Sequence, residues 1–506
     1  MWKHPKFFLF LICGLYLLQT AWVCFDFLFQ ITDSDQTIQW LGLHNYSQGI
    51  YHEPYYYGQN YNLMAEAWLG IPLHWAGFPL QISLVIATKL LWTITTIWLS
   101  FTLFKRQFVF TALAVLGLSI AMPLEWHILT GVPRGFIQGV SVGLAGVIIG
   151  WNYLTNKKWW NLAFSVLLMI SGVLLNPNAA LLFVAPGLWM FLHYKIKLRE
   201  IVIAVLSTLP PLILYFLASN FYRHHADYVL HTTWHLQFTV DAFLENMGHI
   251  VYLFKGLFPW IYEGGLAFIG LWLILMGFAW KKSKNRERMI LMGMVLTLVA
   301  TLFLNKLTDG SGSIFFPFVR MYIALFFWYL VPVMMIESKW IPTQKSRWAA
   351  ILMMISLASF LLFFALYTPR KNRIIKTGKG TVDVISVKQL ASDCEHLNTL
   401  LSSQGKNLLV ILGKSDAHNY GCAPTVSTFH PDYERRTWIY HQYIQHPVNQ
   451  CLFLDRDNVI PTAIRRHRIN ARLISEKPYK IYAIHAPDLD VISLYQTCDW
   501  RILGKR

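Results

Sequence analysis

The sequence predicts a polytopic α-helical membrane protein with about 11 transmembrane helices, followed by an outward-facing soluble α/β domain. Of its 506 residues, 55% are hydrophobic and 14% are charged, against roughly 25% charged residues in soluble domains. The mean hydropathy is +0.41. Apolar runs of about 18 or more residues, the length that a membrane-spanning helix needs, recur along the first three-quarters of the chain.

Each apolar run predicts one membrane span, with boundaries uncertain by a few residues. The predicted spans are 7–29, 81–103, 108–123, 136–155, 160–175, 179–194, 200–219, 264–280, 289–304, 321–336 and 348–367. We interpret the first as a signal anchor that stays in the mature protein, because its apolar run is long and no small-residue cleavage site follows.

The distribution of Lys and Arg predicts the orientation. With the N-terminus inside, the inner segments hold 17 Lys and Arg and the outer loops hold five, which is the asymmetry of the positive-inside rule. Region 30–80 and the C-terminus are then both outside, and we expect a bacterial inner membrane. The net charge of +17 comes from short clusters between spans and not from a nucleic-acid-reading motif, so we expect no nucleic-acid partner.

After about Thr368 the composition changes. Residues 370–506 carry 20 Lys and Arg and 12 Asp and Glu, with no spanning run. Short β-like runs at 407–412, 451–455 and 480–484 alternate with helix-like stretches near 387–403 and 432–445, as in a small α/β domain. We therefore expect a transmembrane domain at 1–368, which includes outer loop 30–80, and an extracytoplasmic domain at 369–506.

Four of the six cysteines lie in this second domain. In an oxidising compartment four cysteines allow three pairings, and four unpaired thiols are the alternative. The spacing does not select one. The cysteines of the second domain are Cys394, Cys422, Cys451 and Cys498.

The outer loop at 30–80 contains no Lys or Arg, but it does contain carboxylates. Asp33 and Asp35 follow the first span and share a face if the backbone is extended. Two close carboxylates repel, which raises the pKa of one of them and suits it to act as a general base. The alternative is that both are solvated residues that cap a helix.

Glu66 lies in an apolar, helix-like stretch at 61–70. A lone carboxylate among apolar residues is costly unless it is paired or functional, so Glu66 is a candidate for the same site. The alternative is a helix-surface residue that faces water. Tyr55–Tyr57 and Trp68 are candidates for a sugar-stacking wall or, alternatively, for an interfacial aromatic belt.

Cations outside the acidic loop are candidates to bind a lipid-linked phosphate, since Arg forms bidentate contacts with phosphate oxygens. Lys89 lies inside a predicted span, where a buried cation suggests a functional partner and snorkelling to the interface is the alternative. The other candidates are Arg134, Arg223 and Arg320.

The sequence gives no metal motif. His231 and His235 have i, i+4 spacing, but no catalytic Glu stands between them, so we interpret these histidines as interfacial or substrate-contacting residues. No cofactor is indicated, although a divalent metal stays open.

Several of these residues together resemble a known family. Ser34-Asp35-Gln36, then Tyr57-Gly58-Gln59-Asn60-Tyr61, then Glu66-Ala67 with Leu69, Pro72 and Gly77 look like the first outer loop of bacterial membrane glycosyltransferases of the GT-C superfamily. That superfamily includes the dolichyl-phosphate-mannose-protein mannosyltransferase-like and aminoarabinose-transferase-like enzymes. Arg320 with Tyr322 is similar to a basic-aromatic pair late in that family.

The resemblance implies a polyprenyl-phosphate-linked sugar donor and a glycan, lipid or protein acceptor on the outer face of the membrane. It implies Asp35 as the general base of an inverting displacement and Glu66 as a second acidic group. Tyr57, Gln59, Tyr61 and Tyr322 would contact sugar or acceptor. The family usually has an acidic residue where this chain has Gln36, so the choice between Asp33 and Asp35 stays open.

Two other functions compete with the glycosyltransferase. A lipid or polysaccharide transporter or flippase without chemistry would line a path with charges, for which Asp26 and Lys89 are the candidates in span interiors. A non-catalytic scaffold would use the C-terminal domain to recruit partners.

Overall fold

The structure is a computed structural model of the 506-residue chain. It describes residues 5–55, 62–225, 228, 237–307, 317–340, 345–381, 384–406, 408–412, 416–429, 451–455, 460, 471–477 and 479–484.

The chain divides into two compact units. The first unit comprises Met1–Phe27, Val85–Leu217 and Thr233–Lys376, and the second comprises Leu28–Leu84, Ala218–Thr232 and Thr377–Arg506. The predicted domains, 1–368 and 369–506, stay a prediction. Residues 28–84, which include the predicted outer loop, group with the unit that contains the C-terminal part of the chain.

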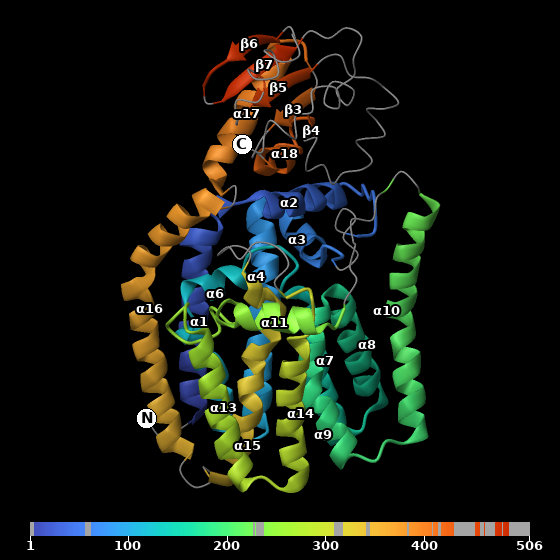
Figure 1. The fold of residues 1–506 in the computed structure, drawn as a ribbon, viewed down its shortest axis with the longest axis vertical. Helices are drawn as coiled ribbons and strands as arrows, with labels where there is room; N and C mark the ends of the chain where they lie inside the picture. The colour runs from blue at the N-terminus through green and yellow to red at the C-terminus, as the bar shows by residue number, and fades with distance from the viewer. Residues whose placement is uncertain are drawn as a thin grey trace. The chain divides into compact units, whose positions relative to one another are not determined.

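The first unit is helical, and Figure 1 shows its long helices. The helices from the N-terminus to residue 193 are α1 (Pro5–Val23), the π-helix η1 (Cys24–Leu28), α4 (Leu80–Lys105), α5 (Val109–Ala121), α6 (Leu124–Leu129), α7 (Gln138–Asn156), α8 (Trp159–Leu175), η2 (Pro177–Phe183) and α9 (Val184–His193). Those that follow are α10 (Leu198–His224), α11 (Val240–Gly248), α12 (Ile250–Leu253), α13 (Gly265–Lys282), α14 (Asn285–Thr301), η3 (Phe318–Tyr329), α15 (Leu330–Trp340) and α16 (Lys345–Thr381).

Helices cover every range that the sequence predicted as a span. Among the residues that the structure describes, five helices are long and apolar enough to cross a membrane. These five are Pro5–Leu28, Leu80–Lys105, Leu198–His224, Phe318–Lys339 and Arg347–Thr377. Four shorter apolar helices lie at Val109–Ala121, Trp159–Leu175, Pro177–His193 and Gly265–Lys281. The helical membrane character is confirmed, while the number 11 stays a prediction.

Glycines let α7 and α8 approach closely. A Cβ at Gly139 would lie 2.5 Å from the carbonyl oxygen of Gly172 and 2.8 Å from the backbone nitrogen of Asn176. Small residues at a helix contact allow backbones to pack together in lipid, where no hydrophobic force drives helices together. This contact fixes the end of α8, from which Asn176 extends.

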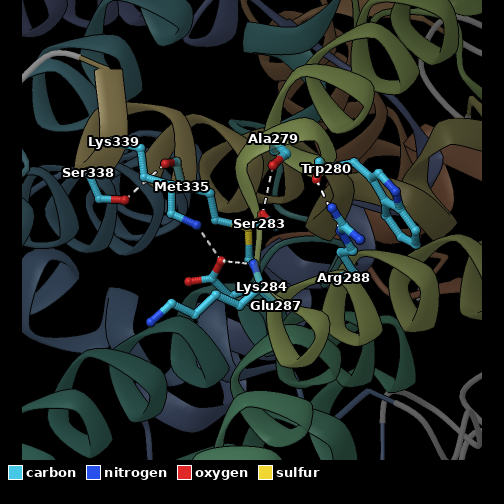
Figure 2. A network of polar contacts seen from close by, with 9 residues as sticks. All are labelled: Ala279, Trp280, Ser283, Lys284, Glu287, Arg288, Met335, Ser338 and Lys339. Atoms are coloured by element: carbon cyan, nitrogen blue, oxygen red, sulfur yellow. Dashed lines mark hydrogen bonds and ion pairs between the residues drawn. The ribbon is translucent and has the colours of Figure 1, made fainter.

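Figure 2 shows how the turn between α13 and α14 is tied to α15. Glu287 accepts a hydrogen bond from the backbone nitrogen of Lys284 (2.9 Å) and forms an ion pair with Lys339. Ser283 donates to the carbonyl oxygen of Ala279 (2.7 Å). The turn lies in the most basic of the predicted inner segments, and Glu287 offsets part of that charge.

The second unit contains a five-stranded sheet with strand order β4-β3-β5-β7-β6. Strand β3 is parallel to β4 and β5, whereas β7 is antiparallel to β5 and β6. The predicted α/β pattern is confirmed at β3, β5, β7 and α17, while the helix predicted near 432–445 lies outside the described residues. The elements are α17 (Val387–Ser403), β3 (Leu408–Leu412), α18 (Asp416–Gly421), β4 (Thr428–Phe429), β5 (Cys451–Asp455), β6 (Ala471–Ser475) and β7 (Lys480–Ile484).

Two further helices, α2 (Ser34–Ser47) and α3 (Ala65–Trp75), lie in the same unit. They occupy much of what the sequence presented as a long loop. Their apolar side chains and those of the sheet and α17 form one hydrophobic cluster, which includes Leu41, Ala67, Leu397, Leu409 and Ile481. In addition, β1 (Ile31–Thr32) pairs antiparallel with β2 (Ile385–Ser386).

Candidate functional site

Asp33 starts α2. It has an extended backbone (φ −144°, ψ 179°) and its Oδ1 accepts a hydrogen bond from the backbone nitrogen of Gln36 at 3.1 Å. Its Oδ2 accepts a second bond from Gln36 Nε2 at 3.0 Å. The side chain is fully buried. Asp33 is therefore an N-cap, as the helix-cap alternative predicted. It is buried, however, and that alternative expected a solvated residue.

Asp35 lies in the first turn of α2 and is partly exposed. The expectation that Asp33 and Asp35 share a face on extended backbone is wrong, because the helix begins at Ser34 and residues two apart on a helix do not face each other. The helix N-terminus favours a carboxylate at this position. The two aspartates thus differ: Asp33 is buried and accepts two hydrogen bonds from Gln36, and Asp35 is partly exposed.

Glu66 lies in the first turn of α3, and its side chain is fully buried. The alternative of a helix-surface residue facing water is therefore wrong. Its neighbours Met64 and Ala67 belong to the hydrophobic cluster shared with α2. A carboxylate in such surroundings is costly unless other groups stabilise it, which keeps Glu66 a candidate for the site.

Glu53 is a buried carboxylate that sequence reasoning passed over. Its Oε2 accepts a hydrogen bond from the hydroxyl of Tyr222 at 2.7 Å. Tyr55 stacks on the same ring, with centroids 5.6 Å apart, and its hydroxyl lies 2.8 Å from Ser219 Oγ. Tyr55 is thus a buried packing residue and not part of a stacking wall. The signal in the sequence was a lone Glu among tyrosines.

Several predicted residues lie outside the described residues. They are Tyr57, Gln59 and Tyr61, predicted to contact sugar or acceptor, and the histidine pair His231 and His235. Within the described residues, no group of three or more His, Cys, Asp or Glu side chains is arranged to hold a metal ion.

Lys89 lies in α4 and is 4% exposed. Its Nζ donates a hydrogen bond to Thr130 Oγ1 at 3.0 Å, and that hydroxyl donates to the carbonyl oxygen of Trp126 at 2.9 Å. Snorkelling, the alternative for Lys89, is therefore wrong. The cation is directed into the first unit, toward the segment that leads to Arg134.

Arg134 and Arg320 are also buried, and two asparagines connect their segments. Asn176 Nδ2 donates to the carbonyl oxygen of Gly135 at 3.2 Å, and Asn178 Nδ2 donates to that of Arg320 at 2.8 Å. Asn176 Oδ1 also accepts from the backbone nitrogen of Asn178 at 3.2 Å. The segments of Arg134 and Arg320 are thus joined through two asparagines, both of which were missed in the sequence, while Lys89 bonds separately to Thr130.

The remaining predicted residues differ from this group. Arg223 is exposed near the end of α10. Tyr322 is fully buried, with its hydroxyl 2.9 Å from Thr301 Oγ1 and its ring 4.9 Å from that of Phe254. Packing accounts for these contacts of Tyr322.

Asp26, a candidate for a transport path, forms an ion pair with Lys371 of α16 at 2.6 Å. Arg373 of the same helix pairs with buried Glu125 at 2.9 Å. These basic residues fasten α16 to two other parts of the first unit. Asp26 therefore has a structural partner, and its place in the chain is explained without transport.

The second unit holds a further polar cluster. Asp393 Oδ2 lies 2.9 Å from His418 Nε2 and accepts from the hydroxyl of Tyr479 at 2.7 Å, while Oδ1 accepts from Gln389 Nε2 at 2.7 Å. Burial alone would raise the pKa of Asp393, but these hydrogen bonds outweigh it and the pKa lies below its ordinary value.

A disulfide joins Cys394 of α17, the residue after Asp393, to Cys422, the residue after α18. Cys394 and Cys422 are bonded, which identifies one of the predicted pairings. Cys498 lies outside the described residues. The disulfide and the cluster around Asp393 together hold α17 and α18.

No protein-family model and no curated protein matches the chain. Over 95% of its length it is similar to 98% of the chain in the crystal structure of ArnT from Cupriavidus metallidurans in the apo state. The two share 13% identical residues and superpose with a TM-score of 0.46. A likeness of this size carries no argument about activity, so the function is argued from this chain's own residues.

Proposed function

We propose that the protein is a membrane glycosyltransferase that transfers a sugar from a polyprenyl-phosphate-linked donor to an acceptor on the outer face of the membrane. The support is the resemblance of the first outer region to that family together with the local chemistry of its carboxylates. No metal or cofactor is part of the proposal.

The observation that carries the proposal is the difference between the two aspartates after the first span. Asp33 has both carboxylate oxygens engaged by Gln36 and is buried, whereas Asp35 is partly exposed. A general base must reach the proton that it abstracts. We therefore assign the base to Asp35 and a cap role to Asp33, with buried Glu66 as the second acidic group.

The reaction is a single displacement. The carboxylate of Asp35 takes the proton of the acceptor hydroxyl or amine while that atom forms a bond to the anomeric carbon. The bond from the anomeric carbon to the phosphate oxygen breaks, and polyprenyl phosphate leaves with the electron pair. Attack from the face opposite the phosphate inverts the anomeric configuration.

Cations stabilise the charge that develops on the leaving phosphate. Lys89, Arg134 and Arg320 are the candidates in the first unit, because all three are buried. Asn176 and Asn178 join the segments of the two arginines, and Lys89 donates to Thr130. Arg223, which is exposed, is the weaker candidate.

The test is turnover of the purified full chain in lipid nanodiscs. The donors are a panel of polyprenyl-phosphate-linked sugars, the acceptor is a lipid extract of the source membrane, and release of polyprenyl phosphate is measured. We expect D35N to lower turnover by about 10²–10⁴-fold, the usual size of a general-base loss. E395Q, at an exposed position of α17, is the matched control and should retain full turnover.

Unchanged turnover in D35N would remove the proposed mechanism. Movement of intact donor across the bilayer without release of polyprenyl phosphate, unaffected by D35N and E66Q, would support the transporter instead. Activity that survives removal of residues after Lys376 would show that the C-terminal part does not take part in the chemistry.

A further inference from the structure

Helix α18 is fixed to α17 by two side-chain contacts. Cys394 of α17 is bonded to Cys422, and Asp393 Oδ2 lies 2.9 Å from His418 Nε2. The backbone nitrogen of Cys422 donates to the carbonyl oxygen of His418 at 3.0 Å, so both contacts act on the same helical turn. The side chains of His418 and Cys422 are fully buried. The position of this turn is therefore set by α17.

Gly421 is the residue at which α18 meets both α17 and α2. A Cβ at Gly421 would lie 2.7 Å from Leu390 Cδ2 of α17 and 3.1 Å from Thr37 Cγ2 of α2. Carbon atoms in favourable contact lie about 3.5–4.0 Å apart, so a side chain at this position requires a neighbour to move. Because Gly421 directly precedes Cys422, the disulfide holds its backbone against α2.

Thr37 transmits this contact to the first turn of α2. Its side chain is fully buried. Its hydroxyl donates to the carbonyl oxygen of Ser34 at 2.8 Å, and its backbone nitrogen donates to that of Asp33 at 3.0 Å. Asp35 lies within the turn that these two bonds close, so a displacement of Thr37 also displaces Asp35.

Apolar packing supports the same contact. Ile38 and Leu41 of α2 belong to one hydrophobic cluster with Tyr420 of α18 and with both cysteines of the disulfide. Protein interiors are close-packed and transmit strain. A shift of α18 must therefore be accommodated by α2.

We propose that α18 is a positioning element for Asp35. The Cys394–Cys422 bond holds Gly421 against Thr37, and Thr37 holds the turn that carries the carboxylate. The expected effect on turnover rests on the proposed function, in which Asp35 is the base. Gly421 has no side chain that could take part in the chemistry, so its contribution is geometric.

The main variant is G421A, in which the disulfide can still form. Because misplacement of a catalytic group by about 1 Å can cost about 10²-fold in rate, we expect a kcat about tenfold lower, with the KM for the donor changed by less than about twofold. T37S removes Cγ2 and keeps the hydroxyl that bonds to Ser34, so G421A/T37S should regain most of the lost turnover. G270A in α13 is the matched control, because a Cβ there meets nothing within 4 Å.

Amide hydrogen exchange of the full chain in nanodiscs gives a readout that needs no activity. Peptides from residues 34–43 should exchange faster in G421A and in C394A/C422A than in the unchanged chain, and G421A/T37S should return toward the unchanged rate. Peptides from α13 serve as the internal reference. An intact Cys394–Cys422 bond on a non-reducing gel verifies that G421A and G421A/T37S are folded.

Unchanged exchange of residues 34–43 in G421A and C394A/C422A would overturn the inference. A loss of turnover in G421A that T37S does not restore would also overturn it. D35N separates this result from the proposed function. If D35N keeps full turnover, the proposed function fails, and the exchange of α2 alone decides whether α18 positions the turn that carries Asp35.

Discussion

The backbone of Ile31 pairs with the backbone of Ser386 in the antiparallel bridge between β1 and β2. Ile31 follows the first span, and Ser386 follows the last. Because a hydrogen-bonded pair of strands cannot have its two members on opposite sides of a bilayer, both segments lie on the same side. Ten predicted spans lie between these two segments, and an even number of spans returns the chain to the same side.

This relationship predicts labelling from one side. Single cysteines at Gln48 and Glu395, both exposed, should react with a membrane-impermeant maleimide in intact cells. A cysteine at Lys284, in the most basic inner segment, should react only after permeabilisation. Reaction of the Gln48 and Glu395 variants from opposite sides would contradict the strand pairing.

Substitutions at Asp33 and Asp35 should separate stability from catalysis. D33A removes the cap of α2 and should cost about 0.5–2 kcal/mol of unfolding free energy, whereas D33N keeps an acceptor and should cost much less. D35N should leave the unfolding free energy nearly unchanged and lower turnover. Denaturant unfolding and turnover of the same preparations give both quantities, and a stable but inactive D33N would reverse the two roles.

Loss of the Cys394–Cys422 bond should destabilise the second unit. The cysteines are 28 residues apart. A disulfide that closes a loop of that length stabilises a fold by about 3–4 kcal/mol, because it lowers the conformational entropy of the unfolded chain. C394A/C422A should therefore unfold at lower temperature, with a mobility shift on a non-reducing gel. C13A/C24A, in which only the first span changes, should show no such shift. Equal unfolding temperatures with and without the bond would show that it does not constrain the unit.

Acid should weaken the second unit through Asp393. Its pKa is depressed in the folded protein, so the stabilisation is present above the pKa of the unfolded chain, about 3.9. This stabilisation is lost as the pH falls through the lower pKa that Asp393 has in the folded protein. D393N should flatten the pH dependence of unfolding below about pH 4, while E395Q, next to the same disulfide but exposed, should keep it. A D393N protein with the full acid dependence would rule out this origin.

Asn178 should act on the donor through Arg320. N178A removes the bond to the carbonyl oxygen of Arg320 and should raise the KM for the donor by about fivefold, equivalent to about 1 kcal/mol, with a smaller effect on kcat. N246A is the matched control, because Asn246 also donates to carbonyl oxygens inside the first unit, at Leu302 and Leu304. An equal change of KM in both variants would indicate general loosening and not positioning.

Much of the fold follows from local patterns. The apolar runs predicted helices at every expected range, and the β-like runs at 407–412, 451–455 and 480–484 became β3, β5 and β7. The acidic and aromatic region at 30–80 was less predictable. Its helix α2 has one continuous buried stretch from Gln36 to Leu43, so it lacks the alternation of faces that marks a surface helix.

Some residues of the candidate site were also predicted from the sequence, and others were found only in the structure. Residue type alone marked Asp33, Asp35, Glu66, Lys89, Arg134 and Arg320, because charges near apolar segments are costly. Glu53, Asn176 and Asn178 were missed, since their partners Tyr222, Gly135 and Arg320 lie far away in the sequence and a neutral amide gives no signal of its own.

The sequence by itself determined that this is a helical membrane protein with an α/β part. Long apolar runs and the two-residue alternation of strands are patterns of neighbouring residues, so the sequence displays them directly. Only the tertiary structure decided that α2 and α3 share a core with that α/β part. The tertiary structure also decided which aspartate is buried under Gln36 and which cysteines pair. These results depend on contacts between distant segments, and such contacts have no local period that a sequence can display.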